Sequence, residues 1–387
     1  MIRRQIAAAP EATSLFGLLL VLAAWGQAQP SINSHEVHPD GSITLRFVDP
    51  AASKVLVHVD GLAKPLPMEK DKDGVWSTTT SPLPPQIYGY GFEADGESRL
   101  DPNNAAITPN LIYRSNMVLV HGSAPQLWEA QDVPHGLVHH HFYTSRIVQN
   151  LEGGQSDFYV YTPPGYDSKK SKKYPVLYLL HGWSDLANGW SEVGQANLIL
   201  DNLIAQRRVR PMIVVMPLGY GDMKFVTSGD HVWDDDARVG RNVSLFSQAL
   251  LTEILPRVEV DYRASKSRDD RAITGLSMGG LESLTTGLTH SDKFGWVGGF
   301  SSALGHKEEE QLGAITGKTV NLHLLWIACG TEDDLITNNR HFITWLKITW
   351  LKSKDLPLTA VETPGMHNWM VWRDNLVHFA PLLFQKK

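Results

Sequence analysis

The second half of the chain alternates short apolar runs with longer amphipathic segments, and this alternation restricts its fold more than any other feature. The runs are almost continuously apolar and lie at residues 176–180, 212–216, 271–274 and 324–328. Such runs are typical of parallel strands that are buried on both faces. Segments of helical length lie between or after them, at residues 196–206, 245–258, 280–289 and 340–352. Strands and helices in alternation predict a doubly wound α/β domain, which we place at residues 123–387.

Residues 29–122 show a different pattern, with a period of two and no helical segment. Apolar and polar residues alternate at residues 42–47 and 54–59, as they do in half-buried strands. Turn signals separate the runs, at Asp60-Gly61, Asp73-Gly74 and Asp95-Gly96. Short strands at this spacing predict a small all-β sandwich ahead of the α/β domain.

The first 28 residues have the order of features found in a secretory signal. Arg3 and Arg4 precede an apolar run at residues 15–25, and Ala28 follows as a small residue suited to cleavage. The run is shorter than the roughly 20 residues that a membrane-spanning helix needs. We therefore predict a bacterial signal peptide at residues 1–28 and a secreted or periplasmic mature protein that is not held in the membrane. The alternative is a disordered or helical start of a cytosolic protein.

The charge balance and the cysteine content exclude several classes of protein. Lys and Arg number 35 against 41 Asp and Glu, a net charge of −6, which argues against nucleic acid as a partner. We interpret the lysine-rich stretch at residues 169–173 as a solvated loop. Cys329 is the only cysteine, so the chain cannot form an internal disulfide, and its position in an apolar run predicts a buried thiol.

The hexapeptide from Gly275 to Gly280 contains the pattern G-x-S-x-G around Ser277. It follows a predicted strand and begins a predicted helix. A serine on such a tight turn has its hydroxyl lifted clear of the sheet, and the flanking glycines allow the turn without Cβ clashes. We predict that Ser277 is a nucleophile; the alternative is a glycine-rich loop with a hydrogen-bonding serine.

A serine hydroxyl needs a base, and the base in turn needs an acid. In this fold the acid and then the histidine follow the serine along the chain. Glu332, Asp333 and Asp334 come just after the run at residues 324–328, and His367 comes after a strand-like segment at residues 358–362. His367 is therefore the predicted base, while the residues alone leave open which of the three carboxylates is its partner.

Two backbone N–H groups are predicted to form an oxyanion hole. One belongs to Met278, which follows the nucleophile, and the other to Trp183, in the loop after the strand at residues 176–180. Tryptophans in loops near this site suggest an aromatic substrate pocket, and we name Trp190, Trp233 and Trp369 as candidate contacts. The alternative is that these tryptophans are core residues.

Neither a metal nor another cofactor is predicted. His139, His140 and His141 are consecutive on a predicted strand, where neighbouring side chains point to opposite faces and chelate poorly. The acidic run at residues 234–236 has no ligand spacing and is interpreted as a solvated or helix-capping loop.

At these motifs the chain resembles carbohydrate esterase family 1, which contains feruloyl and acetylxylan esterases. The resemblance covers roughly residues 135–385. The matching motifs are Tyr161 to Tyr166, Leu180-His181-Gly182, Gly275 to Gly280, Cys329 to Asp333 and Gly365 to Trp369. It implies an α/β-hydrolase fold and a cofactor-free serine esterase. Because the acid of that family lies in a Gly-Thr-x-Asp turn, the resemblance also implies that Asp333 is the partner of His367.

Residues 29–122 resemble an immunoglobulin-like early-set domain similar to family 48 carbohydrate-binding modules. Trp76, Tyr88 and Tyr90 could stack on sugars there or fill the core of the sandwich, and we favour the core.

We therefore expect a secreted esterase that removes feruloyl groups from plant cell-wall polysaccharide, with that acylated polysaccharide or its oligosaccharides as its partner. The alternatives are an acetylxylan esterase, an enterochelin-type siderophore esterase, a mycolyl-type acyltransferase, and a non-catalytic carbohydrate-binding protein. The signal peptide argues against the siderophore esterase, and an intact triad argues against the non-catalytic protein.

Overall fold

The computed structural model describes residues 32–167, 171–305, 312, 320–349 and 357–385. The described residues from Asn33 onward belong to one compact unit. The predicted signal peptide, together with Lys169 and Lys170 of the lysine-rich stretch, lies outside these ranges. Within them, no helix has both the length and the apolar character needed to span a bilayer.

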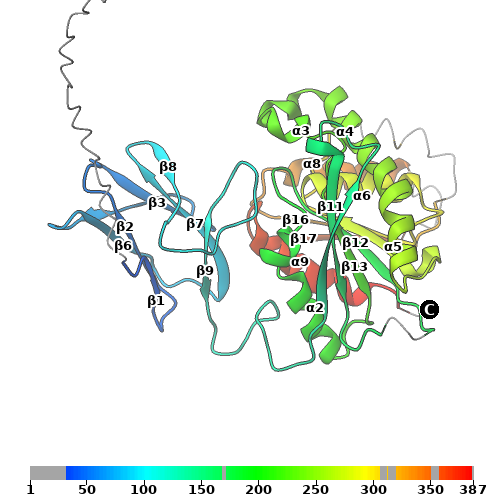
Figure 1. Cartoon of the computed structure of the whole chain (residues 1–387), viewed down its shortest axis with the longest axis horizontal. Helices are drawn as coiled ribbons and strands as arrows, with labels where there is room; N and C mark the ends of the chain where they lie inside the picture. The colour runs from blue at the N-terminus through cyan, green and yellow to red at the C-terminus, as the bar shows by residue number, and fades with distance from the viewer. Residues whose placement is uncertain (1–31, 168–170, 306–311, 313–319, 350–356, 386–387) are drawn as a thin grey trace, which may run out of the picture. The chain divides into compact units, whose positions relative to one another are not determined.

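A mixed sheet forms the centre of the α/β part (Figure 1). Its eight strands among the described residues lie in the order β10-β11-β13-β12-β14-β15-β16-β17. The pairs β10–β11 and β11–β13 are antiparallel, and every later pair is parallel. The carboxyl ends of the parallel strands therefore share one edge, where sites form in open α/β sheets. The strands are β10 Leu137–Thr144, β11 Gln155–Thr162, β12 Val176–Leu180, β13 Ile213–Pro217, β14 Arg271–Gly275, β15 Trp296–Phe300, β16 Leu324–Gly330 and β17 Leu358–Thr363.

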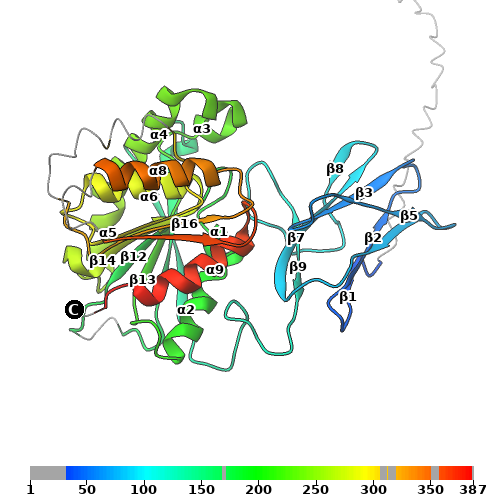
Figure 2. The same ribbon diagram turned by 180° about the vertical axis from the view of Figure 1, so that it is seen from behind.

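Helices cover both faces of this sheet (Figures 1 and 2). On β12, Leu177 and Leu179 pack in one core with α2 and α9, whereas Tyr178 and Leu180 pack in a second core with α4, α5, α6 and α8. Both cores exist because successive side chains of a strand point to opposite faces. The longer helices are α2 Ala196–Ala205, α4 Asp236–Ala249, α5 Leu255–Asp261, α6 Met278–Thr289, α8 Ile336–Thr349 and α9 Trp369–Phe379. The shorter helical segments are α1 Gly189–Glu192, α3 Lys224–Thr227, a π-helical stretch Leu250–Ile254, and the 3₁₀ turns Glu152–Gly154, Asp230–Asp234, Arg268–Asp270 and Ala380–Leu382.

The predicted α/β fold with an all-β region ahead of it is confirmed. The four apolar runs correspond to β12, β13, β14 and β16, with ends that differ by two residues at most. Strand β15 escaped prediction because two glycines weaken its β pattern. The helix predicted at residues 245–258 is part of a longer helical run from Asp236 to Asp261, which Asp235 caps by accepting the N–H groups of Ala237 and Arg238.

The all-β part consists of two antiparallel sheets. One has the order β1-β2-β6-β5 and the other β4-β3-β7-β8, with β9 also paired to β7. Trp76, Tyr88 and Tyr90 are buried between them, as the core interpretation predicts. The boundary predicted between residues 122 and 123 stays a prediction. The strands are β1 His35–Val37, β2 Ile43–Val48, β3 Val55–Val59, β4 Leu66–Pro67, β5 Glu69–Lys70, β6 Val75–Thr79, β7 Gln86–Ala94, β8 Glu97–Arg99 and β9 Asn116–Val120.

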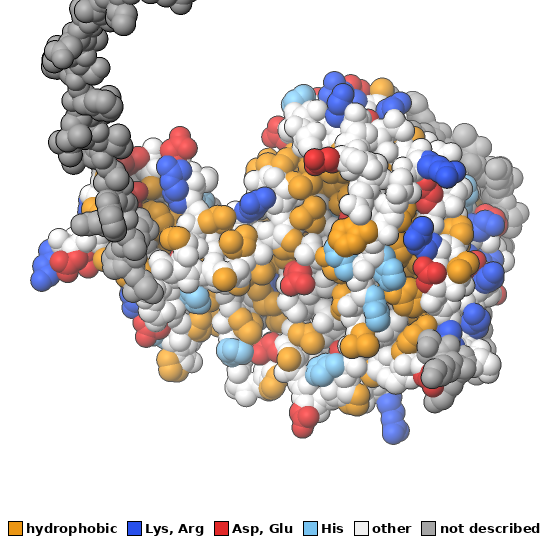
Figure 3. Space-filling view, in the orientation of Figure 1, with side chains coloured by type: hydrophobic (Ala, Val, Ile, Leu, Met, Phe, Trp, Pro, Cys, Tyr) orange, Lys and Arg blue, Asp and Glu red, His pale blue; other side chains and the backbone are white. Residues whose placement is uncertain are grey.

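The three consecutive histidines lie on β10, at the edge of the large sheet. The His140 ring stacks on Tyr159 with 4.0 Å between centroids, whereas His141 stacks on Phe158 at 4.9 Å. Figure 3 shows histidine side chains beside hydrophobic ones over the region of β11. Among the described residues, no group of three or more His, Cys, Asp or Glu side chains is placed to hold a metal ion. The histidines of β10 thus contact aromatic neighbours.

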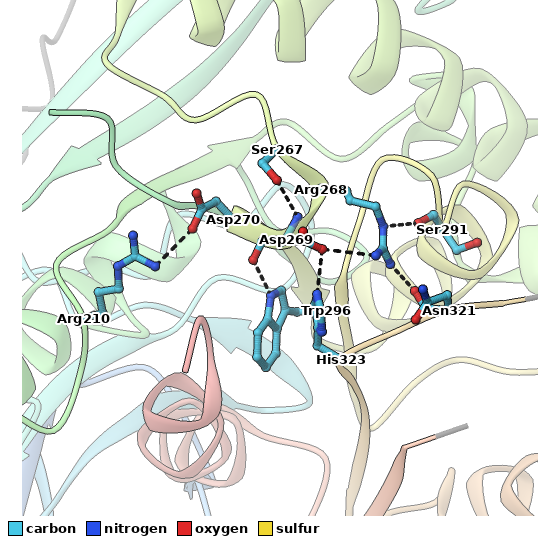
Figure 4. A network of polar contacts seen from close by, with 9 residues as sticks. All are labelled: Arg210, Ser267, Arg268, Asp269, Asp270, Ser291, Trp296, Asn321 and His323. Carbon is cyan, nitrogen blue, oxygen red and sulfur yellow. Dashed lines mark hydrogen bonds and ion pairs between the residues drawn. The ribbon is translucent and has the colours of Figure 1, made fainter. Parts of the chain in front are cut away.

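Polar contacts tie together the amino ends of three parallel strands (Figure 4). The Asp269 carboxylate, just before β14, accepts a hydrogen bond from His323 Nε2 at 2.7 Å, and its carbonyl accepts the indole N–H of Trp296 at 2.8 Å. The neighbouring Arg268 donates to the carbonyl of Ser291 at 2.8 Å. Trp296 begins β15 and His323 precedes β16, so this network aligns the strands at the edge away from their carboxyl ends.

Arg373 on α9 joins the α/β part to the sandwich. Its guanidinium donates to Gln86 Oε1 at 3.0 Å and to the carbonyls of Ile87 and Val193 at 2.8 Å each. The side chain is fully buried, and burial lowers the pKa of Arg373 to about 9, so it stays charged at neutral pH. The three oxygen acceptors and the charge of Asp60 offset the cost of burying the guanidinium.

Replacement of Arg373 by Met should lower the free energy of unfolding by about 3 kcal/mol, because the buried acceptors lose a charged donor. Thermal and denaturant unfolding of the whole chain measure the effect. Arg340→Met is the matched control, since Arg340 forms an exposed pair with Glu362 and its loss should change the midpoint little. Equal midpoints for the two variants would contradict the anchoring role.

Candidate active site

Ser277 lies on the sharp turn between β14 and α6. Its backbone has φ 51° and ψ −114°, a strained conformation for a residue with a side chain. The turn is this tight because glycines flank it. A Cβ on Gly275 would lie 2.6 Å from the carbonyl of Gly279, and a Cβ on Gly279 would collide with the carbonyl of His181. The predicted strand–turn–helix setting of Ser277 is thus present.

Ser277, His367 and Asp333 form one hydrogen-bonded series. His367 Nε2 lies 3.0 Å from Ser277 Oγ, and His367 Nδ1 lies 2.9 Å and 3.1 Å from the two carboxylate oxygens of Asp333. The histidine follows β17 and the aspartate follows β16, so both approach from the edge where the parallel strands end. The Nδ1–H group donates to Asp333, which leaves Nε2 free to accept the serine proton.

Among the three adjacent carboxylates, only Asp333 is turned inward. It is 2% exposed, whereas Glu332 and Asp334 are exposed to solvent. Burial alone would raise the pKa of Asp333, but the hydrogen bond and charge of His367 outweigh it and the pKa is lowered. The amide of Leu335 also donates to Asp333 at 2.8 Å. Asp333 therefore stays ionised and fixes the orientation of the imidazole.

The two predicted oxyanion donors belong to residues next to Ser277, one in the sequence and one across the loop after β12. Met278 begins α6, so its N–H has no partner within the helix. Trp183 lies in the loop after β12, where a Cβ on Gly182 would be only 3.4 Å from the Cβ of Ser277. The helix N-terminus adds a partial positive charge at the same point. Both backbone groups are thus near the serine hydroxyl.

A cavity of about 270 Å³ opens at Ser277 and His367. Trp183, Trp369 and Trp372 are among the residues that line it. Residues ahead of the α/β part also line the cavity, namely Asp60, Ile87, Gly89, Thr108, Asn110, Tyr113, Ser115 and Met117. The volume is close to the lower end, about 300 Å³, of ordinary ligand sites. A small acyl group with a flat apolar surface fits such a cavity better than a long chain.

The three tryptophans predicted to contact substrate differ in position. Trp369 lines the cavity. Trp190 is fully buried and donates its indole N–H to the carbonyl of Leu180, so its prediction as a substrate contact is wrong. It packs edge-on against Trp369 with 5.2 Å between centroids and supports the wall from behind. Trp233 is not among the lining residues and packs against Trp183 at 6.5 Å.

Comparison with known families agrees with this geometry. A model of the Esterase family matches residues 150–382, which include the serine, the aspartate and the histidine. The chain belongs to the Esterase family. Its α/β part is an α/β-hydrolase-like domain and a carboxylic ester hydrolase, as predicted from the motifs.

Known proteins resemble this esterase in sequence and in structure. An endo-1,4-beta-xylanase/feruloyl esterase of Xylanibacter ruminicola is 28% identical over 366 residues, which are 93% of this chain and 46% of that protein. The chain thus spans about half the length of this relative. A ferulic acid esterase of Anaeromyces mucronatus superposes with a TM-score of 0.56 at 24% identity, covering 67% of this chain and 96% of the other. An enterochelin esterase of Shigella flexneri superposes with a TM-score of 0.67 at 18% identity, covering 91% of this chain and 95% of the other. At these levels of identity, the two superpositions show a shared fold and nothing further.

Sandwich residues that line the esterase cavity escaped prediction. Asp60, Thr108 and Tyr113 lie more than 150 positions from Ser277 and carry no motif. Asp60 does precede a glycine in a turn signal, but that pattern indicates only a turn. Trp372 had a weak signal, because it follows Trp369 by three positions and so shares its helix face.

Buried polar groups lie beneath the serine turn of the esterase. Burial lowers the pKa of His181 to about 4, so the ring is neutral, and its Nδ1–H donates to the carbonyl of Gly182 at 2.7 Å. Its Nε2 accepts the N–H of Gly219 at 2.8 Å. Glu282 on α6 is 0% exposed, and burial raises its pKa well above the usual range. The Glu282 carboxyl is therefore held in its neutral form.

Glu282 should make the folded state less stable as the pH rises. Below its ordinary pKa of about 4.3 both states are protonated, whereas at higher pH the unfolded state releases a proton that the folded state retains. Glu282→Gln removes this penalty and should raise the unfolding free energy at pH 8 more than at pH 5. Denaturant unfolding at the two pH values measures the difference. Glu69→Gln on the exposed strand β5 is the control, and a pH-independent effect of Glu282→Gln would contradict the protonated state.

Proposed function

We propose that this chain is an exported serine esterase that hydrolyses feruloyl and related hydroxycinnamoyl esters on plant cell-wall polysaccharide. The observation that carries the proposal is the hydrogen-bonded series Ser277–His367–Asp333 at the mouth of a small cavity with tryptophans in its wall. Ser277, His367 and Asp333 are the proposed catalytic residues.

In the first half of the reaction Ser277 Oγ attacks the ester carbonyl carbon. His367 Nε2 removes the hydroxyl proton as the bond forms, and Asp333 stabilises the imidazolium. The carbonyl oxygen becomes an oxyanion that accepts hydrogen bonds from the backbone N–H groups of Trp183 and Met278. When the tetrahedral intermediate collapses, the C–O bond to the alcohol breaks and His367 gives its proton to the leaving oxygen. An acyl-serine and a free alcohol result.

The second half releases the acid. His367 Nε2 removes a proton from water, whose oxygen attacks the acyl-serine carbonyl. The second oxyanion uses the same two N–H groups, and its collapse breaks the bond to Ser277 Oγ, which regains the proton from His367. The original serine proton leaves with the alcohol, and a proton from water replaces it. Ser277 and His367 thus return to their starting protonation states, and the cycle requires no cofactor.

The size and wall of the cavity support a hydroxycinnamoyl substrate. Trp183 and Trp369 offer flat apolar surfaces on which an aromatic acyl group can pack. The relative from Xylanibacter ruminicola bears the name of a xylanase and feruloyl esterase, and its similarity to this chain extends across the sandwich. We also propose that the chain is a member of carbohydrate esterase family 1 and that its sandwich binds carbohydrate.

Hydrolysis of methyl ferulate by the whole chain, beside acetylated xylan, enterochelin and nitrophenyl acetate, tests this function. Wild-type protein should favour the ferulate, and Ser277→Ala should lower its turnover by roughly 10⁴-fold or more. Preference for acetylated xylan or for enterochelin would replace the feruloyl assignment by that substrate. Ferulate hydrolysis that Ser277→Ala leaves intact would contradict the serine mechanism.

If the protein is exported, removal of the signal peptide should leave a mature protein that begins at Gln29. N-terminal sequencing of the mature protein measures this.

The neighbouring carboxylates offer a matched test of the acid. Asp333→Asn should lower kcat by roughly 10³- to 10⁴-fold, because an amide no longer holds the imidazole in the tautomer that accepts the serine proton. Asp334→Asn makes the same chemical change on an exposed residue and should retain wild-type kcat. Steady-state kinetics with nitrophenyl acetate distinguish the two. Equal effects of both substitutions would remove Asp333 from the mechanism.

A further inference from the structure

We propose that Asn110, a residue of the loop between β8 and β9 of the sandwich, is a positioning residue for the oxyanion loop of the esterase. The oxyanion loop is defined as residues 181–185, which carry the Trp183 N–H. The proposal rests on the proposed serine mechanism, because it concerns a group that acts on the oxyanion.

The oxyanion loop is strained and has weak internal support. Ser184 has φ +71°, a left-handed conformation that is unfavourable for a residue with a side chain. Within the loop, Asp185 N donates to the carbonyl of Gly182 at 3.3 Å, and Gly182 N donates to Asp185 Oδ2 at 3.3 Å. Both bonds are longer than the usual 2.9–3.0 Å. Other contacts must hold Ser184 in this conformation.

The sandwich supplies such contacts. Asn110 Nδ2 donates to Ser184 Oγ and to Asp185 Oδ1, at 2.9 Å each. The amide of Leu111 donates to the Ser184 carbonyl at 2.7 Å. These bonds fix the strained residue from both its side chain and its backbone. Asn110 and Asp185 also face each other as an isolated β-bridge.

Asn110 is itself held in a defined orientation. Its Oδ1 accepts the backbone N–H groups of Ile112 and Tyr113, at 2.9 Å and 2.7 Å. With its oxygen occupied in its own loop, the amide directs both donors away from it. The side chain is 9% exposed, so water competes little for these bonds.

The Asp185 carboxylate links Asn110 to Gly182 of the oxyanion loop. It accepts Asn110 on one oxygen and Gly182 N on the other, and Gly182 directly precedes Trp183. Burial raises the pKa of Asp185 to about 7, while the Asn110 amide and the Gly182 N–H favour its ionised form.

The ionisable groups around this pair are His181, Tyr220, Glu282 and Arg114. The first three are buried and neutral near pH 7, since burial lowers the pKa of His181 and raises those of Tyr220 and Glu282. Tyr220 donates its hydroxyl to the Asp185 carbonyl at 3.0 Å, and Arg114 donates to the Asn110 carbonyl at 3.1 Å. The Asn110 amide is thus the donor that neighbours the Asp185 carboxylate from the sandwich side.

Asn110→Asp tests the proposal with the least change in shape. It keeps the oxygen that accepts Ile112 and Tyr113 but replaces the two donors by a second carboxylate beside Asp185. At pH 8 we expect kcat for nitrophenyl acetate to fall about 10- to 100-fold with little change in KM, because an oxyanion donor acts mainly in the transition state.

The pH dependence separates positioning from general destabilisation. Two adjacent carboxylates readily share one proton at lower pH, which restores a hydrogen bond between positions 110 and 185. The ratio of kcat for Asn110→Asp to kcat for wild type should therefore rise as the pH falls from 8 to 6. Asn110→Ala has no carboxyl group with which to share a proton, so its ratio should rise less than that of Asn110→Asp.

Asn103→Asp, which adds a charge on an exposed residue of the same loop, is the control and should retain wild-type kcat. Ser184→Ala removes one acceptor of Asn110 and provides a milder variant, with an expected loss of about 3- to 10-fold in kcat. Wild-type kcat in Asn110→Asp and Asn110→Ala, or a loss in Asn110→Asp that does not depend on pH, would overturn the proposal. A wild-type chain that hydrolyses no ester would instead refute the proposed function.

Discussion

The active site depends on the close packing of the start of α6 against the end of β12. A Cβ on Gly279 would collide with the carbonyls of Leu180 and His181, and a Cβ on Gly275, at the end of β14, would collide with Gly279. This contact brings the strained Ser277, the proposed nucleophile, beside the loop that carries Trp183, a proposed oxyanion donor. It also buries the first turn of α6, which is why Met278 is 0% exposed while its N–H remains beside the serine.

The buried polar groups around this contact differ in charge state, and the hydrogen-bond partners of each group determine whether it is charged or neutral. His181 and Glu282 are buried and become neutral because no opposite charge neighbours them. Asp333 is equally buried, yet it stays ionised because His367 donates to it. The Asp333 carboxylate beside the histidine thus gives the imidazole a defined tautomer, whereas His181 and Glu282 add no charge beneath the serine.

The sandwich contributes to the site through two separate contacts. Arg373 attaches the helix that follows His367 to β7, and Asn110 contacts the oxyanion loop. The first contact involves the helix that follows His367, and the second involves the loop that carries the Trp183 N–H. Sandwich residues also line the cavity at Ser277. The two halves of the chain are therefore parts of one esterase site, which is consistent with their forming a single compact unit.

Local pattern was sufficient to predict the α/β fold, the serine turn and the histidine, because strand period, glycine spacing and chain order are properties of neighbouring residues. It could not choose among Glu332, Asp333 and Asp334, since their difference is burial, which only the packing of the loop after β16 sets. The prediction for Trp190 was wrong for the same reason. The sequence does not distinguish a tryptophan that lines a cavity from one that is buried behind the lining residues. Asp60 and Asn110 carry no motif at all. They meet the site only because folding brings the sandwich against the α/β part, a long-range contact that tertiary structure alone decides.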